Sequence, residues 1–475
     1  MSAFPQIDFN LLLPHILLAG SASLLLIIDL FIPAHRKSIN QFFATLFLLI
    51  TLVVTYSVLW GNPVSSTMLH ADGFAVFFIF IFISAAVLVI LTSDQYLRTT
   101  NSNIGEFYAL IIFAAAGASV MASAADLITL FIGLEIMSLS LYILAGLRRE
   151  RLASNEAAMK YFLIGAFFSG FLLYGIMLIF SVTGTTNIAE IVAAANSSSV
   201  TFVAGAVLVF LAFAFKASLF PFHFWSPDVY DGAPTPVSAF MATAAKAAAF
   251  AAILRVFFHL FPKLGIDVTT ALWIVAALTM TVGNTLAIAQ SNLKRMLAYS
   301  SVAHAGYLFV GFLAVNESTV QAIMFYLFAY TLMNVGAFTV AYLINKRGTG
   351  DYQLNNLAGI GVQHPLLAVA MAVFMFSLAG IPPTAGFFGK FYLFRAALDA
   401  GFVYLVIIAV LNSALSVFYY LRVLVIMFMQ KEEHAAAPVK LGPPVSVALI
   451  LCVIGILSFG IFPGALIDFL QLAGL

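Results

Sequence analysis

Charged residues are scarce in this chain. Of its 475 residues only 8% are Asp, Glu, Lys or Arg, whereas 63% are hydrophobic and the mean hydropathy is +1.09. A soluble domain usually carries about 25% charged residues, so these charges are too few to cover a globular surface. With a formal net charge of +1, the chain also lacks the excess of basic residues that is typical of a nucleic-acid-binding domain. The composition therefore excludes a soluble enzyme, a disordered chain and a nucleic-acid binder, and it indicates a protein embedded in a lipid bilayer.

Cysteine is almost absent. The single Cys452 excludes a disulfide framework and a cysteine-ligated iron–sulfur cluster, and no Cys-x-x-Cys-His motif is present for covalent haem. No three histidines stand at the spacing of metal ligands. The sequence therefore predicts no metal site, no iron–sulfur cluster and no covalent haem in this chain.

The chain consists instead of long apolar runs. A membrane-spanning helix needs about 20 mostly apolar residues, and the sequence contains about fourteen such runs. The runs are continuous and not alternating, so they predict helices and exclude the strands of a barrel. We therefore predict an all-α polytopic membrane protein of about 14 transmembrane helices that forms one membrane domain, 1–475. The predicted spans are roughly 12–32, 41–60, 74–93, 107–123, 127–146, 160–183, 202–220, 235–258, 270–289, 297–315, 320–343, 364–397, 402–429 and 445–470.

Two of the predicted spans are interrupted. The twelfth is too long for one straight helix, and it contains the run Gly380 to Pro383 followed by Gly386. The seventh leads into a stretch from Pro221 to Pro236 that holds four prolines and Gly232. The backbone groups freed in a broken helix are tolerated only where protein or water covers them. Both interruptions therefore predict half-helices in the protein interior.

The distribution of Lys and Arg predicts the orientation. The loops that follow odd-numbered spans hold twelve cations, whereas the loops that follow even-numbered spans hold Lys263 alone. Because positive residues favour the cytoplasmic side, the odd-numbered loops are predicted to be cytoplasmic and both termini to lie on the outer side. The first run lacks a basic n-region and a cleavage site, so it is interpreted as a span and not as a cleaved signal. The twelve loop cations are Arg36, Lys37, Arg98, Arg148, Arg149, Arg151, Lys294, Arg295, Lys346, Arg347, Lys431 and Lys440.

Some charged residues stand deep inside predicted spans. Lys246 lies about 17 Å into its span, Lys216 about 20 Å and Glu135 about 12 Å, at 1.5 Å per residue. A charge at such depth costs about 2.5–3.5 kcal/mol on the insertion scale, so a functional role is favoured. A structural salt bridge is the alternative for Glu135 and Lys216. No acid of comparable depth is present in the sequence for Lys246 and Lys390.

Buried lysines next to one acid predict a proton relay with a gate. Burial disfavours the charged form of a lysine, and an approaching carboxylate favours it. At about 6 Å and an effective dielectric near 20, the interaction of such a pair is roughly 3 kcal/mol. Movement of Glu135 relative to Lys216 would therefore switch the lysine between holding and losing its proton. Lys246, Lys390 and His304 would be further stations, bridged by water held at the broken helices.

Three further residues have two interpretations each. Lys160 opens the sixth span and is either an anchor on the cytoplasmic side or the end of a proton path. His304 is predicted to be buried and is either a relay group or a hydrogen-bonded core histidine. His223 stands beside the Pro221 break, and the same two interpretations apply to it. Three arginines stand towards span ends, where they can snorkel: Arg255, Arg395 and Arg422.

Four sequence motifs resemble one family. The segment 220–237 (FPFHFWSPDVYDGAPTPV) is similar to the loop between helices seven and eight of the antiporter-like subunits of respiratory complex I, the proton-pumping NADH:quinone oxidoreductase. The segment 378–391 (LAGIPPTAGFFGKF) resembles that family's broken twelfth helix, 132–139 (IGLEIMSL) its fifth helix, and 291–301 (SNLKRMLAYSS) the start of its tenth. The similarity covers nearly the whole chain, and it is greatest to the subunit N branch.

The resemblance implies a fold and a set of site residues. The family fold has two inverted five-helix repeats, here spans 4–8 and 9–13, with helices 7 and 12 broken. It divides the chain into helices 1–3 (1–106), a first repeat (107–260), a second repeat (268–430) and a last helix (440–475). Within it Glu135 and Lys216 match the paired gate, Lys246 the central lysine, Lys390 the terminal lysine and Lys160 the lysine of the sixth helix. Subunit M is less similar, because it usually carries a glutamate where Lys390 stands.

The resemblance also implies a function for a subunit of an enzyme complex. That function is proton translocation coupled to quinone reduction in partner subunits, with no redox centre in this chain. NADH, FMN, iron–sulfur clusters and quinone are then expected in partner subunits. The expected partners are the antiporter-like subunit M, small membrane subunits such as K, and the lipid bilayer of the cell inner (cytoplasmic) membrane.

Other functions remain as alternatives. A subunit of a multi-subunit cation/proton antiporter, or of a membrane-bound hydrogenase, would share the fold and the buried charges and differ in its partners. A solute carrier would need convergent polar groups at the two breaks, where the sequence has mainly Gly, Pro, Ala and Phe. A purely structural spacer would leave the buried lysines unexplained.

Overall fold

The computed structural model describes residues 8–195, 199–264, 268–314, 317–345, 352–431 and 441–472. Up to residue 264 its helices are α1 (Phe9–Leu30), α2 (Ile39–Leu59), α3 (Gly73–Thr99), α4 (Gly105–Ser123), α5 (Leu127–Ala145), α6 (Leu152–Thr183), α7 (Ile188–Ala193), α8 (Val200–Ala217), α9 (Trp225–Gly232), α10 (Thr235–Phe240), the π-helical turn η2 (Met241–Ala245) and α11 (Lys246–Leu260). From residue 268 they are α12 (Thr269–Ile288), α13 (Leu293–Phe312), α14 (Glu317–Ile344), α15 (Ile360–Gln363), α16 (Pro365–Ala379), α17 (Ala385–Asp399), α18 (Val403–Met429), α19 (Pro443–Ile461) and α20 (Pro463–Leu472).

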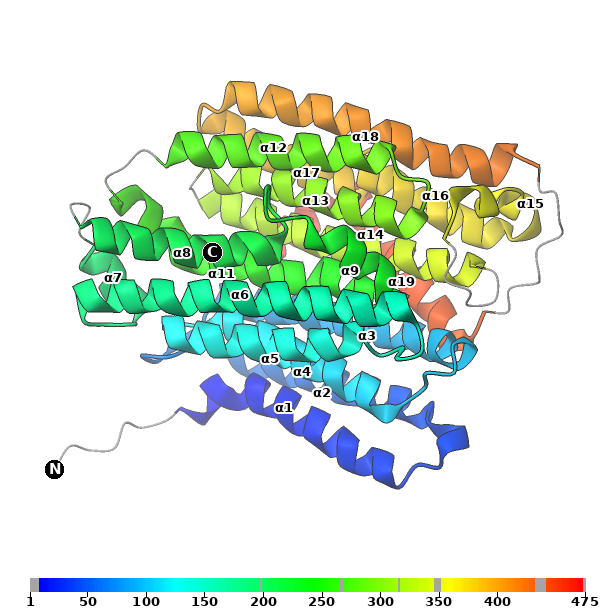
Figure 1. The fold of residues 1–475 in the computed structure, drawn as a ribbon, viewed down its shortest axis with the longest axis horizontal. Coiled ribbons are helices and arrows are strands. Elements are labelled where there is room, and N and C mark those ends of the chain that lie inside the picture. Colours follow the sequence, from blue (N-terminus) through cyan, green and yellow to red (C-terminus); the bar gives the residue numbers. More distant parts are fainter. Residues whose placement is uncertain are drawn as a thin grey trace.

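The long helices lie side by side, with their axes roughly aligned (Figure 1). Helix α1 lies at one edge of the bundle and α18 at the opposite edge, with α11, α13 and α14 between them (Figure 1). Short 3-10 helices occur at Ala34–Arg36, Phe261–Lys263 and Leu354–Leu357. The strands β1 (Val64–Ser65) and β2 (His70–Ala71) form a small antiparallel hairpin before α3. The central helices are therefore shielded from lipid by the outer ones.

The predicted all-α membrane fold is confirmed. Within the described residues, 12 helices are long and apolar enough to cross a membrane. Of the remaining predicted spans, the tenth corresponds to the 20-residue helix α13 and the twelfth to the two half-helices α16 and α17. The exact number of spans stays a prediction.

Both predicted helix breaks are present. Helix α8 ends at Ala217, Ser218 adopts the left-handed conformation with φ 60°, and the next helix starts at Trp225. Helix α16 ends at Ala379, and Gly380 takes up φ 84° before α17 starts at Ala385. Glycine adopts a positive φ without the steric cost of a side chain, which is why this residue type fits the second break. The two breaks leave helix ends inside the bundle.

Glycines set the close crossings of α4 with α5 and of α12 with α13. A Cβ placed on Gly117, Gly133, Gly283 or Gly306 would lie only 2.4, 2.8, 2.6 or 2.7 Å from the backbone of the facing helix. Lipid offers no hydrophobic drive for helix association, so small residues that permit close van der Waals contact take its place. The same kind of crossing thus recurs in the two halves of the chain, as the predicted repeats require, although the repeats themselves stay a prediction.

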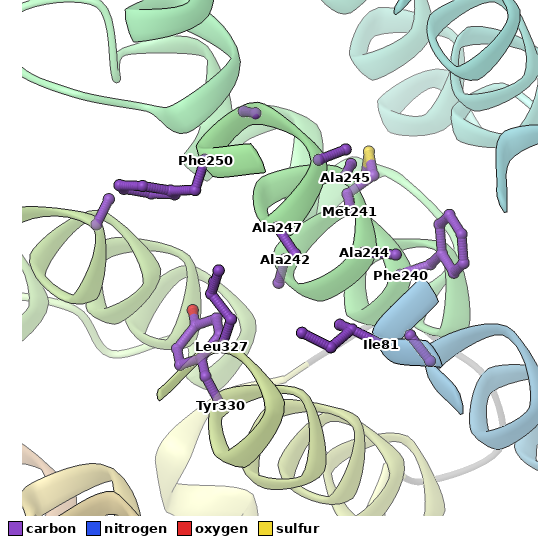
Figure 2. Packing of buried hydrophobic residues seen from close by; sticks show 14 of the residues in the cluster. Ile81, Phe240, Met241, Ala242, Ala244, Ala245, Ala247, Phe250, Leu327 and Tyr330 are labelled. Atoms are coloured by element: carbon purple, nitrogen blue, oxygen red, sulfur yellow. The ribbon is translucent and has the colours of Figure 1, made fainter. Parts of the chain in front are cut away.

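The helix built from α10, η2 and α11 is, like α14, among the most deeply buried segments that the structure describes. Figure 2 shows its small and apolar side chains packed between Ile81 of α3 and Leu327 and Tyr330 of α14. Its alanines Ala242, Ala244 and Ala247 are completely buried. A π-helical turn inside an α-helix is rare and frequently marks a functional site. Here the π-helical turn directly precedes Lys246.

Two predicted segments differ in detail from the structure. The run 445–470 is not one helix but α19 and α20, which are separated at Phe462. The reason is Pro463, which has no backbone N–H to continue a helix but fits the first position of a new one. Between the predicted spans 160–183 and 202–220, where no helix was predicted, the structure has the short helix α7, whose first backbone N–H groups are capped by Asn187.

One loop cation was assigned wrongly. Lys294 is completely buried in the first turn of α13, where its Nζ donates hydrogen bonds to the carbonyls of Asp231 at 3.0 Å and Ala233 at 2.8 Å. These acceptors come from the segment between α9 and α10, so they satisfy the ammonium without solvent. The loop cations Lys346, Arg347 and Lys440 lie outside the described residues.

Candidate functional site

Three lysines and a histidine among the candidate residues are buried in the bundle. Lys216 is 6% exposed, Lys246 1%, Lys390 4% and His304 1%. Buried charges are costly, so each such group needs hydrogen-bond acceptors or aromatic faces near it. The contacts of each group show how it is accommodated.

Lys216 faces aromatic rings from the last turn of α8. Its Nζ is 3.4 Å from Oη of Tyr161 and 3.5 Å from Oη of Tyr142. The same atom lies 4.7 and 5.1 Å from the centroids of these two rings, whose faces attract a cation. Tyr161 in turn stacks on Trp225, whose Nε1 donates to the Phe215 carbonyl at 3.1 Å. Because both hydrogen bonds of Lys216 are long, its ammonium is held loosely.

Glu135 on α5 does not pair with Lys216 in this structure. Its Oε1 accepts a hydrogen bond from Ser169 Oγ at 2.5 Å, and among the described residues it forms no ion pair. Ser169 and Lys216 nevertheless line the same small recess. Glu135 is half-buried, and Ile132 and Ile136 on the same helix are exposed. Glu135 thus lies at the surface of the bundle. The structural salt bridge between Glu135 and Lys216, which was the alternative interpretation, is not formed in this structure.

Lys246 is held by a serine of α13. Its Nζ donates hydrogen bonds to the Ser301 carbonyl and, at 2.5 Å, to Ser301 Oγ. Lys246 begins α11 directly after the π-helical turn, so the backbone irregularity and the buried lysine are adjacent.

His304 lies one turn further along α13. Its Nδ1 is hydrogen-bonded to Oη of Tyr326, and its Nε2 is 2.9 Å from Oη of Tyr420. Oη of Tyr420 is also hydrogen-bonded to Oγ of Ser300. A neutral imidazole donates from one nitrogen and accepts at the other, and a phenol does either. His304 is therefore a hydrogen-bonded core residue whose partners can also pass a proton, which is compatible with both interpretations.

Lys390 caps the carbonyl end of α16 at the second helix break. Its Nζ donates to the carbonyls of Leu378 at 3.0 Å and Ala379 at 3.1 Å, and to Ser413 Oγ at 3.0 Å. The last carbonyls of a helix have no partner within it; without Lys390 the Leu378 carbonyl would be unsatisfied, and the Ala379 carbonyl would keep only a 3.4 Å hydrogen bond from Ser413 Oγ. Three acceptors match the three N–H groups of an ammonium. The Nζ atom also lies 4.8 Å from the centroid of the Tyr307 ring.

Helix α13 connects two of the lysines. Ser301, His304 and Tyr307 follow one another at three-residue intervals, which places them near one another on one face of the helix. Lys246 contacts the first of them and Lys390 faces the third, and the His304 and Tyr307 rings are 5.6 Å apart. Polar and aromatic groups thus extend from Lys246 to Lys390 along a single helix.

Comparison with known proteins places this arrangement in a family. A family model described as "NADH:quinone oxidoreductase/Mrp antiporter, TM" matches residues 124–416, which include all of the candidate residues. NADH-quinone oxidoreductase subunit N of Trichlorobacter lovleyi is 47% identical over 478 aligned residues, which cover 99% of this chain and 98% of the relative. The chain belongs to the subunit N family of NADH-quinone oxidoreductases.

Solved structures show the same fold. A chain of respiratory complex I from Thermus thermophilus is 35% identical and superimposes with a TM-score of 0.83 over 96% of this chain and 98% of that chain. A chain of the Mrp complex from a Dietzia species superimposes with a TM-score of 0.85 over 98% of this chain and 97% of that chain. At 20% identity, this second likeness shows the fold alone.

The remaining candidate residues of this subunit N chain are Lys160 and His223. Lys160 is 40% exposed and forms an ion pair with Glu156 of its own helix α6 at 2.6 Å and another with Asp228 of α9 at 2.9 Å, which connects α6 to α9. His223 lies in the turn between α8 and α9, where its ring stacks on Phe220. Its buried Nδ1 has no hydrogen-bond partner among the described residues. The roles of both stay predictions.

Hydroxyl groups are the contacts that the sequence analysis missed. Ser301 contacts Lys246, Tyr326 and Tyr420 contact His304, and Tyr142 and Tyr161 contact Lys216. The available signal was a hydroxyl residue inside an apolar run. Such residues are common in membrane helices, where they bond to the carbonyl of the preceding turn, so the signal does not identify a partner. Within the described residues, no cluster of His, Cys, Asp and Glu could hold a metal ion.

Proposed function

We propose that this chain translocates protons across the membrane as a subunit of NADH:quinone oxidoreductase. The relay comprises Glu135, Lys216, Lys246, His304 and Lys390, with Lys160 on the cytoplasmic side and His223 at the first break. Membership of the subunit N family supports this function. The buried lysines support the site, because a charge at such depth is costly and none of the three forms an ion pair among the described residues.

The observation that carries the proposal is the line of groups along α13. A proton on Lys246 has the Ser301 hydroxyl as its neighbour, and His304 lies between two phenols one turn away. Hydroxyl and imidazole groups both donate and accept hydrogen bonds, so they pass protons between fixed stations. Lys390 then receives the proton beside Tyr307 and α18. Water completes the steps that direct contacts do not span.

Glu135 acts as the gate of the first half. It is bonded to Ser169 in the structure, and Ser169 shares a recess with Lys216. When the carboxylate turns towards this recess it favours the charged lysine, and when it stays on Ser169 it does not. Because Glu135 lies at the chain boundary, a neighbouring subunit is in a position to move it.

The energy for transport comes from elsewhere in the complex. Each charge moved against 100 mV costs about 2.3 kcal/mol, which an isolated relay cannot supply. We assign NADH, FMN, iron–sulfur clusters and quinone to partner subunits, with subunit M and a small subunit such as K as neighbours. The location is the cell inner membrane, with about 14 spans, both termini outside and two inverted repeats (107–260 and 268–430).

A native gel of gently solubilised membranes tests this assignment. We expect the chain to comigrate with a large band that stains for NADH dehydrogenase activity. Comigration with antiporter subunits in a band without NADH activity would overturn the assignment to NADH:quinone oxidoreductase. That outcome would move the function to an exchanger of the same fold.

A further inference from the structure

A groove on the side of the bundle lies outside the relay. It is bounded by α1, α4 and α5 and by the loops that follow α3 and α5, and its volume is about 1180 Å³. Its rim carries Arg148, Arg149 and Arg151, together with the polar residues Thr100, Asn101 and Ser102. These arginines belong to the loop cations that predict the cytoplasmic side of the membrane. The rim therefore lies at the level of the lipid headgroups.

Below the rim the groove is apolar. Its wall is formed by Leu26 of α1, Leu110 and Phe113 of α4, and Ile143 of α5. Phe113 stands eight residues after the start of α4 at Gly105, which corresponds to about 12 Å along the helix. Leu26 and Ile143 are 36% and 59% exposed. The wall thus continues from the headgroup level into the hydrocarbon region, where acyl chains lie.

Four charged side chains around the groove have no partner among the residues that the structure describes. Arg148, Arg149, Glu106 and Glu150 line it, and none of their side chains forms an ion pair or a hydrogen bond with any residue that the structure describes. Charges of both signs therefore face one opening without being paired to each other.

We propose that this groove binds one zwitterionic phospholipid of the phosphatidylethanolamine type. Arginine binds phosphate oxygens through charge-assisted and often bidentate hydrogen bonds, so the phosphodiester lies at Arg148 and Arg149. The ammonium group of the headgroup lies at Glu106 and Glu150, and an acyl chain covers the apolar wall. Basic pockets between membrane helices on the cytoplasmic side bind the phosphate groups of lipid headgroups, and here the two glutamates add a site for an ammonium.

Other occupants match the groove less well. A free phosphate ion would leave the apolar wall uncovered. A lipid with a purely anionic headgroup would satisfy the arginines but would place negative charge beside Glu106 and Glu150. A segment of a neighbouring subunit is the remaining occupant, and the test below separates it from a lipid.

The test uses the assembled complex, purified in mild detergent and examined by native mass spectrometry and lipid extraction. We expect the wild-type complex to retain a phosphatidylethanolamine molecule that the double variant Arg148→Gln, Arg149→Gln loses, a change of one phospholipid per complex. The control is Arg36→Gln, Arg98→Gln, which removes two exposed arginines on the same predicted side outside the groove. Equal phospholipid content in the groove variant and the wild type would overturn the proposal.

Two further measurements fix the identity of the occupant. In vesicles of mixed phosphatidylethanolamine and phosphatidylglycerol, Glu106→Gln, Glu150→Gln should shift the retained lipid towards phosphatidylglycerol several-fold. Unchanged selectivity would contradict the zwitterionic headgroup. A photoreactive residue in place of Ile143 should cross-link to phospholipid in the otherwise unaltered complex. A cross-link to a partner subunit alone would show that protein fills the groove and would refute the lipid.

Discussion

The two lysines at the helix breaks are buried to a similar degree but held in different ways. Lys216 precedes its break and lies against two tyrosines, at 3.4 and 3.5 Å from their hydroxyl oxygens. Lys390 follows its break and reaches back to two backbone carbonyls and a serine hydroxyl, at 3.0, 3.1 and 3.0 Å. The order of lysine and break along the chain therefore decides which acceptors are in reach.

This difference predicts that the charge of Lys216 changes easily, whereas the charge of Lys390 is held in place by its hydrogen bonds. The ammonium of Lys390 satisfies carbonyls that the broken helix α16 leaves open, so its loss exposes backbone acceptors. The ammonium of Lys216 satisfies no backbone group, so its charge can change at a smaller structural cost. We infer that Lys216, with Glu135 nearby, is the group whose charge state changes most easily in response to its surroundings.

The largest expected effect is that of Lys390→Ala. It removes a relay group and leaves the buried Leu378 carbonyl without its donor, at about 1–3 kcal/mol for an unsatisfied group, while the Ala379 carbonyl keeps only the Ser413 hydroxyl at 3.4 Å. We expect both proton pumping and the thermal stability of the complex to fall, as measured by vesicle acidification and by thermal unfolding of the purified complex. Equal stability of the Lys390→Ala and Lys216→Ala complexes would show that the bonds of Lys390 to the end of α16 do not stabilise the protein, and would contradict the difference between the two lysines.

Lys216→Ala should affect function alone. We expect proton pumping and coupled quinone reductase activity to fall at least about tenfold, because a proton-transfer group is lost. The complex should still assemble, as judged by a native gel. The matched control is Lys263→Ala, which removes an exposed lysine that donates to the Val192 carbonyl outside the bundle interior. Normal activity in a fully assembled Lys216→Ala complex would contradict the relay.

A smaller loss is expected for Ser301→Ala. The substitution removes the hydroxyl that contacts Lys246 and leaves the carbonyl acceptor in place. One such hydrogen bond is worth roughly 1 kcal/mol, which corresponds to about a fivefold fall in pumping rate. The control is Ser93→Ala, in which an equally buried serine loses only a bond to its own helix. An equal effect of both substitutions would show that Ser301 has a packing role only.

The smallest effect on pumping is expected outside both lysine sites, at Asp72. This carboxylate is bound by Arg255 at 2.5 and 2.8 Å. Burial alone would raise the pKa of Asp72, but the hydrogen bonds and charge of Arg255 outweigh it and lower the pKa below the ordinary 3.8. A lowered pKa means that the stabilisation is complete at neutral pH, above the pKa of the unfolded carboxyl, and is lost as the pH falls through the folded pKa.

Asp72→Asn should therefore keep normal pumping and reduce stability at pH 7. We expect its stability deficit, measured by circular dichroism during thermal unfolding, to shrink as the solution is acidified. A deficit that is independent of pH would show that the ionised carboxylate does not contribute. A large pumping defect would show that the clamp belongs to the transport path.

Charge inside an apolar run was the signal that selected the main candidate residues. Glu135, Lys216, Lys246 and Lys390 were selected because charges at those positions are costly, and the structure buries the three lysines. The two helix breaks were predicted from glycine and proline residues, which interrupt the apolar runs beside Lys216 and Lys390. Both inferences rest on energies that act locally and leave a pattern in the sequence.

The partners of these residues could not be predicted, because they come from distant parts of the chain. Ser301 is 55 positions from Lys246, and Tyr420 is 116 positions from His304. The π-helical turn before Lys246 leaves no residue pattern among its alanines, and Lys294 was misplaced because its carbonyl acceptors lie about 60 positions away. Contacts of this kind depend on how the helices cross, which hydropathy does not determine.

The most direct test of the account is the number of protons pumped per NADH by the complex that carries Lys216→Arg. Arginine keeps the positive charge of the site but does not release its proton in a protein. The account predicts a fully assembled complex whose proton yield falls as in Lys216→Ala, because a fixed charge cannot act as a relay group. A normal proton yield would contradict it and would show that Lys216 serves only as a buried charge.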